Sequence, residues 1–166
     1  PLAREALRPG GRREGRARLG GADNLLTQLA GCCRPVAGDP VVGYITRGRG
    51  ITVHRQDCPY VLRYVNECPQ RLIELDWEDL AGREGGTYPV DVRVRAFDRP
   101  GLLRDVAAVL ANEHINVAAV QTQPSRRDHM VSMALTLEIA DLEQLSRVLA
   151  RIGQLPNVQE VRREAH

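Results

Sequence analysis

The clearest feature of the sequence is an alternation of apolar and polar residues in its second half. Apolar side chains occupy every second position of residues 90–96 and again of residues 131–139. A period of two predicts strands with one buried face. Shorter apolar runs predict two more strands, over residues 115–120 and 158–162.

Two helices are predicted between these strands. Apolar residues follow Pro100 at helical spacing from Leu102 to Leu110. Asp141 and Gln144 form a capping-box-like start for the second helix, which then continues to about residue 153. The predicted order is βαββαβ, the ferredoxin-like arrangement.

The first half predicts a smaller unit in residues 23–77. Asp23 can cap a short helix that carries Leu25, Leu26 and Leu29 on one side. A core of this size is marginal, and a bound metal would stabilise it. The other predicted elements are a hairpin with strands 41–46 and 51–54, a helix from near residue 57 to about 65, and a strand over 71–77.

Two segments differ from these units in composition. Residues 1–22 are rich in Arg and Gly, which predicts a disordered linker, with a basic arm for nucleic acid as the alternative. Residues 78–87 are acidic and contain three Gly, which predicts a second linker. The expected fold class is therefore α+β, with a small Cys-rich α+β domain (23–77) followed by a ferredoxin-like domain (88–166).

Length and composition narrow the classes of protein to which the chain could belong. A chain of 166 residues excludes a large multidomain enzyme, and the first residue, Pro1, suggests a piece of a longer polypeptide. All 23 strong cations are Arg, which suits phosphate recognition, although coding bias is the simpler explanation. Four Cys without a signal peptide or a membrane-spanning run indicate a soluble, cytoplasmic protein with no membrane partner. The thiols are thus candidate metal ligands before disulfides.

The first candidate site consists of Cys32, Cys33, His54 and Cys58. Three thiols and one imidazole are a complete tetrahedral set for zinc. Buried cysteines beside a hydrogen-bonded histidine are the alternative, and a catalytic cysteine with His54 as base is a third interpretation. Cys68 lies outside the set and is expected to be an ordinary, partly buried thiol.

Two further groups are candidate binding residues. Arg47, Arg49 and Arg55 surround the predicted hairpin turn and could contact nucleic-acid phosphate, with a solvated hairpin tip as the alternative. At the first strand-to-helix junction of the second unit a small carboxylate could bind, or the residues could form a plain tight turn. The junction comprises Asp98, Arg99, Pro100, Gly101 and Leu102.

Two stretches resemble domains of the long RelA/SpoT-type stringent factors. DNLLTQLAGCCRPVAGDPVVGYITRGRGITVHRQDC, residues 23–58, is similar to their conserved-cysteine or zinc-finger domain. Residues 90–161, with DRPGLLRDVAAVLANEHINV, resemble their ACT domain, also called RRM-like. GYITRGRGITVHRQDC is closer to the RelA branch than to the SpoT branch.

The resemblance implies the C-terminal regulatory module of a GTP pyrophosphokinase, the enzyme that makes (p)ppGpp in the stringent response. The fragment itself is then expected to be inactive. The implied partners are a ribosome with deacylated tRNA in its A site, contacted through large-subunit rRNA, and the protein's own catalytic domains, which the module restrains. The alternative is an amino-acid-sensing ACT module that pairs as a homodimer.

The resemblance also assigns roles to residues. Cys32, Cys33, His54 and Cys58 match the family's proposed zinc ligands, and Asp57 and Cys58 match positions needed for regulation. The segment from Asp98 to Leu102 matches the amino-acid-binding position of other ACT domains. Residues 1–22 have no clear counterpart in the family.

Overall fold

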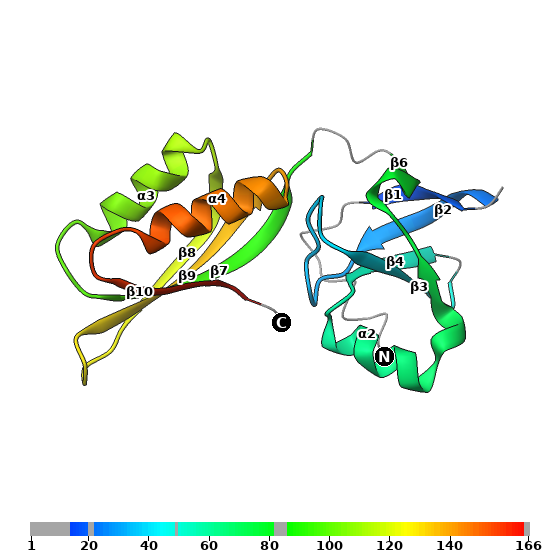
Figure 1. Cartoon of the computed structure of the whole chain (residues 1–166), viewed down its shortest axis with the longest axis horizontal. Helices are drawn as coiled ribbons and strands as arrows, with labels where there is room; N and C mark the ends of the chain where they lie inside the picture. The colour runs from blue at the N-terminus through cyan, green and yellow to red at the C-terminus, as the bar shows by residue number, and fades with distance from the viewer. Residues whose placement is uncertain (1–13, 20–21, 49, 82–85, 165–166) are drawn as a thin grey trace. The chain divides into compact units, whose positions relative to one another are not determined.

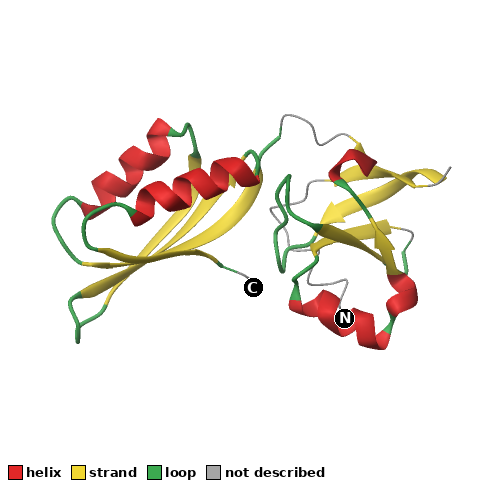
Figure 2. Cartoon of the chain, viewed as in Figure 1, coloured by secondary structure: helices red, strands yellow, loops and turns green. Residues whose placement is uncertain are grey.

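The computed structural model describes residues 14–19, 22–48, 50–81 and 86–164 (Figure 1). The chain divides into two compact units, and Thr87–Glu164 form the second of them. Both units combine helices with a β-sheet (Figure 2), so the predicted α+β class is confirmed. No helix among these residues is long and apolar enough to span a membrane.

The first unit is built on a six-stranded sheet with the order β5-β3-β4-β2-β1-β6. Strands β2 and β4 are parallel, whereas the other neighbours are antiparallel. The hairpin β3–β4 and the helix α2 confirm the sequence prediction. The elements are β1 (Glu14–Leu19), β2 (Ala22–Leu29), β3 (Val41–Ile45), β4 (Gly50–Arg55), α2 (Pro59–Glu67), the 3₁₀ helix η1 (Pro69–Arg71), β5 (Leu72–Glu74), η2 (Trp77–Asp79) and β6 (Leu80–Ala81).

Successive residues of β4 point to opposite faces of this sheet, so each face has its own apolar cluster. Val53 belongs to one cluster, together with Val41, Ile51, Leu75 and Leu80. His54 points to the other side, where the sheet faces α2. The second cluster comprises Ala30, Cys32, Cys33, Tyr44, Cys58, Val61 and Tyr64. The three predicted thiol ligands therefore lie within an apolar core.

Gly43 in β3 marks a place where the first cluster leaves no room for a side chain. A Cβ at this position would lie 2.7 Å from Leu75 Cδ1 and 2.9 Å from side-chain atoms of both Ile51 and Ile73. We expect Gly43→Ala to destabilise the first unit by about 1–3 kcal/mol, the usual cost of overpacking. Denaturant unfolding monitored by Trp77 fluorescence would measure this loss of stability. Gly48→Ala is the control, because nothing lies within 4 Å of that added carbon, and equal stability of the two variants would contradict the prediction.

Two predictions for the first unit are wrong. The segment predicted as a helix from Asp23 is strand β2, in which Leu26 is exposed and the next residue, Thr27, is buried. The strand forms because its backbone pairs with β1 and β4. Residues 1–13 lie outside the described part of the chain, but Glu14–Leu19 form β1 where a disordered linker was expected. The segment predicted as a second linker, 78–87, contains the end of η2 and β6, and its residues 82–85 are not described.

The second unit has the predicted βαββαβ order. Its sheet is antiparallel throughout, with the order β10-β7-β9-β8, and both helices cover the same face (Figure 1). The Asp141 side chain caps α4 by accepting a hydrogen bond of 2.8 Å from the Gln144 backbone N–H. The elements are β7 (Tyr88–Phe97), α3 (Leu102–Asn112), β8 (Asn116–Pro124), β9 (Met130–Ile139), α4 (Leu142–Gly153) and β10 (Val158–Arg163).

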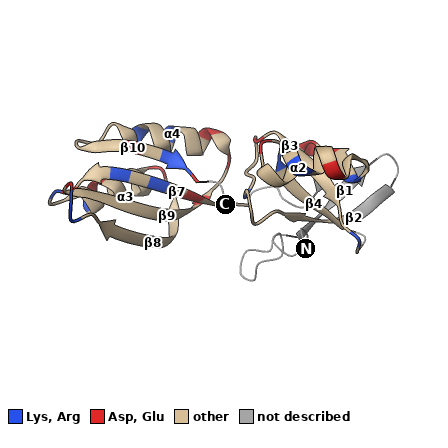
Figure 3. Cartoon of the chain, turned by 90° about the horizontal axis from the view of Figure 1, so that it is seen from below, with Lys and Arg blue, Asp and Glu red and all other residues tan. Residues whose placement is uncertain are grey.

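Charged residues of the second unit occur along β7 and β10 (Figure 3), and on β7 they alternate with buried residues. Arg93 pairs with Glu164 and donates to the Ser132 hydroxyl at 3.0 Å, while Asp91 accepts from Thr136 at 2.7 Å. These contacts join neighbouring strands and satisfy the charges locally. The charges of Asp91, Arg93 and Glu164 are therefore satisfied within the second unit.

Candidate metal centre

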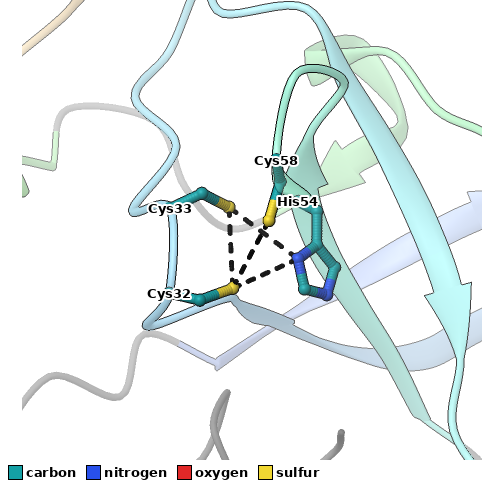
Figure 4. Close-up of side chains that lie close together, drawn as sticks. All are labelled: Cys32, Cys33, His54 and Cys58. Atoms are coloured by element: carbon teal, nitrogen blue, oxygen red, sulfur yellow. Dashed lines mark hydrogen bonds between the residues drawn. The ribbon is translucent and has the colours of Figure 1, made fainter. Parts of the chain in front are cut away.

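Four side chains from three elements meet at one end of the first sheet (Figure 4). Cys32 and Cys33 lie in the turn that follows β2, His54 is near the end of β4, and Cys58 immediately precedes α2. The parallel pairing of β2 with β4 aligns their ends, and the Ala30 N–H donates to the Val53 carbonyl at 2.8 Å. Pairing between strands that are far apart in the sequence thus brings the predicted ligand set together.

The distances within the set suit a tetrahedral metal ion. Cys32 Sγ lies 3.4 Å from His54 Nδ1, 3.7 Å from Cys58 Sγ and 4.0 Å from Cys33 Sγ. Cys33 Sγ lies 3.8 Å from His54 Nδ1, and all four ligand atoms fall within 4.8 Å of one another. Zinc–sulfur bonds of about 2.3 Å place two tetrahedral sulfur ligands about 3.8 Å apart. The side chains therefore surround a space of the right size for zinc.

Burial and mutual contact set the protonation of the thiols. All four residues are at most 7% exposed. Hydrogen bonds with Cys32 and Cys58, together with burial, raise the pKa of the Cys33 thiol well above its ordinary value. Hydrogen bonds from Cys32 and Cys33 lower the pKa of Cys58. A divalent cation would stabilise the thiolates that metal binding requires.

The segment between His54 and Cys58 contacts the candidate site through its backbone. The Arg55 backbone N–H donates to Cys33 Sγ at 3.3 Å, a contact that orients the sulfur and stabilises a thiolate. The Arg55 guanidinium forms an ion pair of 2.8 Å with Asp57, whose side chain is 69% exposed. Asp57, predicted as a regulatory residue, therefore lies at the surface directly before a metal-ligand candidate.

The arrangement suits a structural metal better than catalysis. Cys32 and His54 are close enough for a nucleophile–base pair, but both are buried within the apolar cluster. A catalytic thiol must meet its substrate, whereas a closed four-ligand set is typical of structural zinc. Cys68 packs against the edge of this cluster and is not one of the four, as expected.

The structure separates two of the three arginines predicted to bind RNA, Arg47 and Arg55. Arg47 is exposed in the β3–β4 turn, two residues after the exposed Ile45. Arg55 lies at the opposite end of β4, in its ion pair with Asp57. Arg49 falls outside the described residues. Of the described arginines in this set, Arg47 is the one at the hairpin tip.

The predicted ligand-binding turn of the second unit borders a pocket of about 330 Å³. Gly101 precedes α3 with a φ of +83°, a conformation that favours glycine. Asp98 and Arg99 line the pocket, whose apolar wall comprises Leu102, Leu103, Val131 and Met133. Arg99 also donates to Asp105 at 2.7 Å, and this hydrogen bond lowers the pKa of Asp105.

Two tyrosines next to the candidate metal centre were not predicted from the sequence. The ring of Tyr64 packs edge-to-face against His54, and Tyr44 stacks on Tyr64. Cys58, Val61 and Tyr64 recur every third residue, so they share the inner side of the helix and its start. That spacing is the signal that could have associated Tyr64 with the site.

Two protein families match the chain. Residues 17–78 match the RelA/SpoT RIS domain, and residues 84–163 match the ACT domain. The GTP pyrophosphokinase of Escherichia coli strain K12 is 40% identical over 149 residues, which cover 90% of this chain and 20% of that protein. The GTP pyrophosphokinase of Photobacterium angustum is 42% identical over 143 residues, which cover 86% and 19%. The chain thus spans about a fifth of the length of these relatives.

A solved structure is also similar to part of the chain. The ACT domain from the GTP pyrophosphokinase of Chlorobium tepidum aligns with 47% of this chain and 99% of its own length. Its sequence identity is 14% and the TM-score is 0.42.

Proposed function

Because this chain belongs to the RelA/SpoT family, as a RIS domain followed by an ACT domain, we propose that it regulates a GTP pyrophosphokinase. The observation that carries the proposal is this tandem, about 40% identical to one fifth of such enzymes. The whole protein would transfer pyrophosphate from ATP to GTP or GDP. The module's partner within the same polypeptide would be the catalytic domains. The module would restrain these domains when it is not docked on the ribosome.

The proposed cofactor is one structural zinc ion, held by Cys32, Cys33, His54 and Cys58. The donor set, its burial and its spacing support this assignment. The zinc would join the β2–β3 turn, β4 and the start of α2, and so hold the Arg55–Asp57 segment in one conformation. Metal analysis of protein purified without chelator should find about one zinc per chain.

The proposed docking partner is the ribosome, through large-subunit rRNA and in the presence of deacylated A-site tRNA. The family resemblance motivates the partner, and Arg47 at an exposed hairpin tip supplies a suitable phosphate contact. Cosedimentation of the chain with ribosomes at several salt concentrations tests this proposal. Failure to pellet even at low salt would contradict direct docking.

Arg47→Ala is expected to weaken this cosedimentation and to reduce the salt dependence of binding by about one phosphate contact. The matched control is Arg63→Ala, which removes an exposed arginine from α2 in the same unit. Docking through the hairpin requires a larger effect of Arg47→Ala than of Arg63→Ala. Equal pelleting of both variants and the unaltered chain would remove Arg47 from the interface.

A second candidate function is amino-acid sensing by the ACT domain, and the pocket beside Gly101 favours it. The N-terminus of α3 suits a carboxylate, Asp98 suits an ammonium group, and the apolar wall suits a branched side chain. Calorimetry with leucine, isoleucine or valine should then give saturable heat that Gly101→Val abolishes. If none of the three amino acids produced heat of binding, this candidate function would be removed.

A further inference from the structure

The β8–β9 turn of the second unit carries two adjacent arginines without a partner. The hairpin projects from this unit (Figure 1), and Arg126 and Arg127 are both exposed in its turn, residues 125–129. Within the part of the chain that the structure describes, neither guanidinium makes a hydrogen bond or an ion pair. The positive charge at this turn is therefore available to a partner outside the chain.

Most other arginines of the second unit are paired with carboxylates. Their ion pairs are Arg93–Glu164, Arg99–Asp105, Arg104–Asp105, Arg147–Glu113, Arg151–Glu113 and Arg162–Glu160. The two arginines of the turn thus differ from the rest of the unit, whose charges are largely compensated by neighbours. An uncompensated pair of cations at a projecting turn favours contact with an anionic partner.

The one carboxylate of this turn stabilises the turn itself. Hydrogen bonds from the Ser125 hydroxyl and from the Met130 backbone N–H, the latter 3.1 Å long, lower the pKa of Asp128. The Ser125 N–H donates to the Met130 carbonyl at 2.8 Å and closes the turn. The Asp98 N–H donates to the His129 carbonyl at 2.8 Å, which ties the turn to the end of β7. The two arginines are therefore presented by an anchored backbone.

The end of β7 adds a third arginine and an exposed aromatic ring. Besides the hydrogen bonds of Asp128, the charge of Arg95 also lowers its pKa, so Arg95 lies near the turn. Phe97 pairs with Met130, where β9 begins, and is 44% exposed. Alternation along β7 places Arg95 and Phe97 on one face of the sheet, opposite to the buried Ala96. The ring and the basic turn therefore lie at the same end of the sheet.

Guanidinium groups beside an exposed ring match the chemistry of single-stranded RNA. Arginine binds phosphate oxygens through forked hydrogen bonds, and an unstacked base packs on an aromatic face. An acidic peptide would use the charges alone and leave Phe97 in water. A regular RNA duplex keeps its bases stacked inside the helix, so the ring would have no base to contact. The aromatic ring is thus the feature that favours single-stranded RNA.

We propose that this end of the ACT sheet, formed by Arg95, Phe97, Arg126 and Arg127, binds single-stranded RNA. The arginines contact backbone phosphates, and Phe97 stacks against one base. The inference rests on the ribosome-docking proposal above for the source of the RNA. It deepens that proposal by giving the ACT domain an RNA contact of its own, separate from Arg47 in the RIS domain.

The test measures binding of the full 166-residue chain to a labelled single-stranded RNA of mixed sequence, by fluorescence anisotropy at several salt concentrations. The double variant Arg126→Ala/Arg127→Ala should reduce the slope of log affinity against log salt by about 1.4, because each phosphate contact on a single strand contributes about 0.7. Phe97→Leu should weaken binding roughly tenfold and leave this slope unchanged. Binding of a duplex of the same sequence should not respond to Phe97→Leu.

The matched control for charge is the double variant Arg63→Ala/Arg147→Ala. It removes two exposed arginines from α2 and α4 and changes the net charge equally, so its effect on the slope should be smaller. Equal slopes for the two double variants, or an unchanged RNA affinity of Phe97→Leu, overturn the inference. A polyglutamate peptide that binds as tightly as the RNA, and equally depends on the turn arginines, also overturns it by indicating a general surface for acidic partners.

The same variants separate this inference from the docking proposal. If the unaltered chain binds the RNA through this surface but does not pellet with ribosomes, docking alone is contradicted. If the chain pellets with ribosomes and neither Phe97→Leu nor Arg126→Ala/Arg127→Ala changes RNA binding, the inference alone is overturned. Thermal unfolding of each variant verifies that the ACT domain is folded, as expected for substitutions at exposed positions.

Discussion

Removal of zinc is expected to unfold the RIS domain while the ACT domain stays folded. Structural zinc contributes about 10–16 kcal/mol of binding free energy in zinc-finger peptides, comparable with the whole net stability of a domain, about 5–15 kcal/mol. The four ligand candidates join three elements of the first unit, and none lies in the second. A chelator should therefore abolish one unfolding transition and leave the other.

Trp77 reports on this transition selectively. It is the single tryptophan of the chain, and its indole N–H donates to the Asp39 carbonyl at 2.8 Å within the first unit. Chelation should change Trp77 fluorescence toward that of an exposed indole, and added zinc should reverse the change. Unaltered fluorescence after complete zinc removal would contradict a structural role for the metal.

Cys58→Ser should reproduce the effect of the chelator. Serine keeps nearly the shape of cysteine but does not supply a thiolate, so the site loses one of its three sulfur ligands. Cys68→Ser is the matched control, because Cys68 is a partly buried thiol outside the ligand set. We expect the zinc content and Trp77 fluorescence of Cys68→Ser to match those of the unaltered chain. Equal loss in both variants would mean that Cys58 acts only as a packed core residue.

The sequence predicted the second unit well because each of its elements carries a local signal. Alternation marks β7 and β9, and the Asp141 cap marks the start of α4. The first unit depends more on pairing between distant segments. Leu25, Leu26 and Leu29 fit a helical stripe, but β2 forms because β1 and β4 bind its backbone on both sides. That choice is not encoded in the segment itself.

The ligand set was predictable from residue types, whereas its surroundings were not. Three thiols and one imidazole identify the candidate centre in any order, and the structure places all four together. Arg55 is close to Arg47 in the sequence, but an extended strand places them at opposite ends of β4. The stacking of Tyr44 on Tyr64 depends on how β3 and α2 are placed relative to each other, and no local sequence pattern predicts that placement.

Leu137→Ala is expected to destabilise the ACT domain severely without affecting the zinc site. Leu137 is fully buried on β9, where it pairs with Val90 of β7 and Val117 of β8. Truncation of such a leucine leaves a cavity and costs about 2–5 kcal/mol, which lowers the melting temperature of a domain of this size by roughly 10 °C or more. Differential scanning calorimetry should show one transition shifted, while Trp77 fluorescence and zinc content stay unchanged.

Leu103→Ala provides the matched control for this prediction. It makes the same chemical change on α3, at a side chain that is 54% exposed. The methyl groups removed there are already in contact with water, and alanine favours the helix slightly more than leucine does. Its effect should therefore stay within about 0.5 kcal/mol. Similar shifts for both variants would contradict the burial of Leu137, and a loss of zinc from Leu137→Ala would show that the two units do not fold independently.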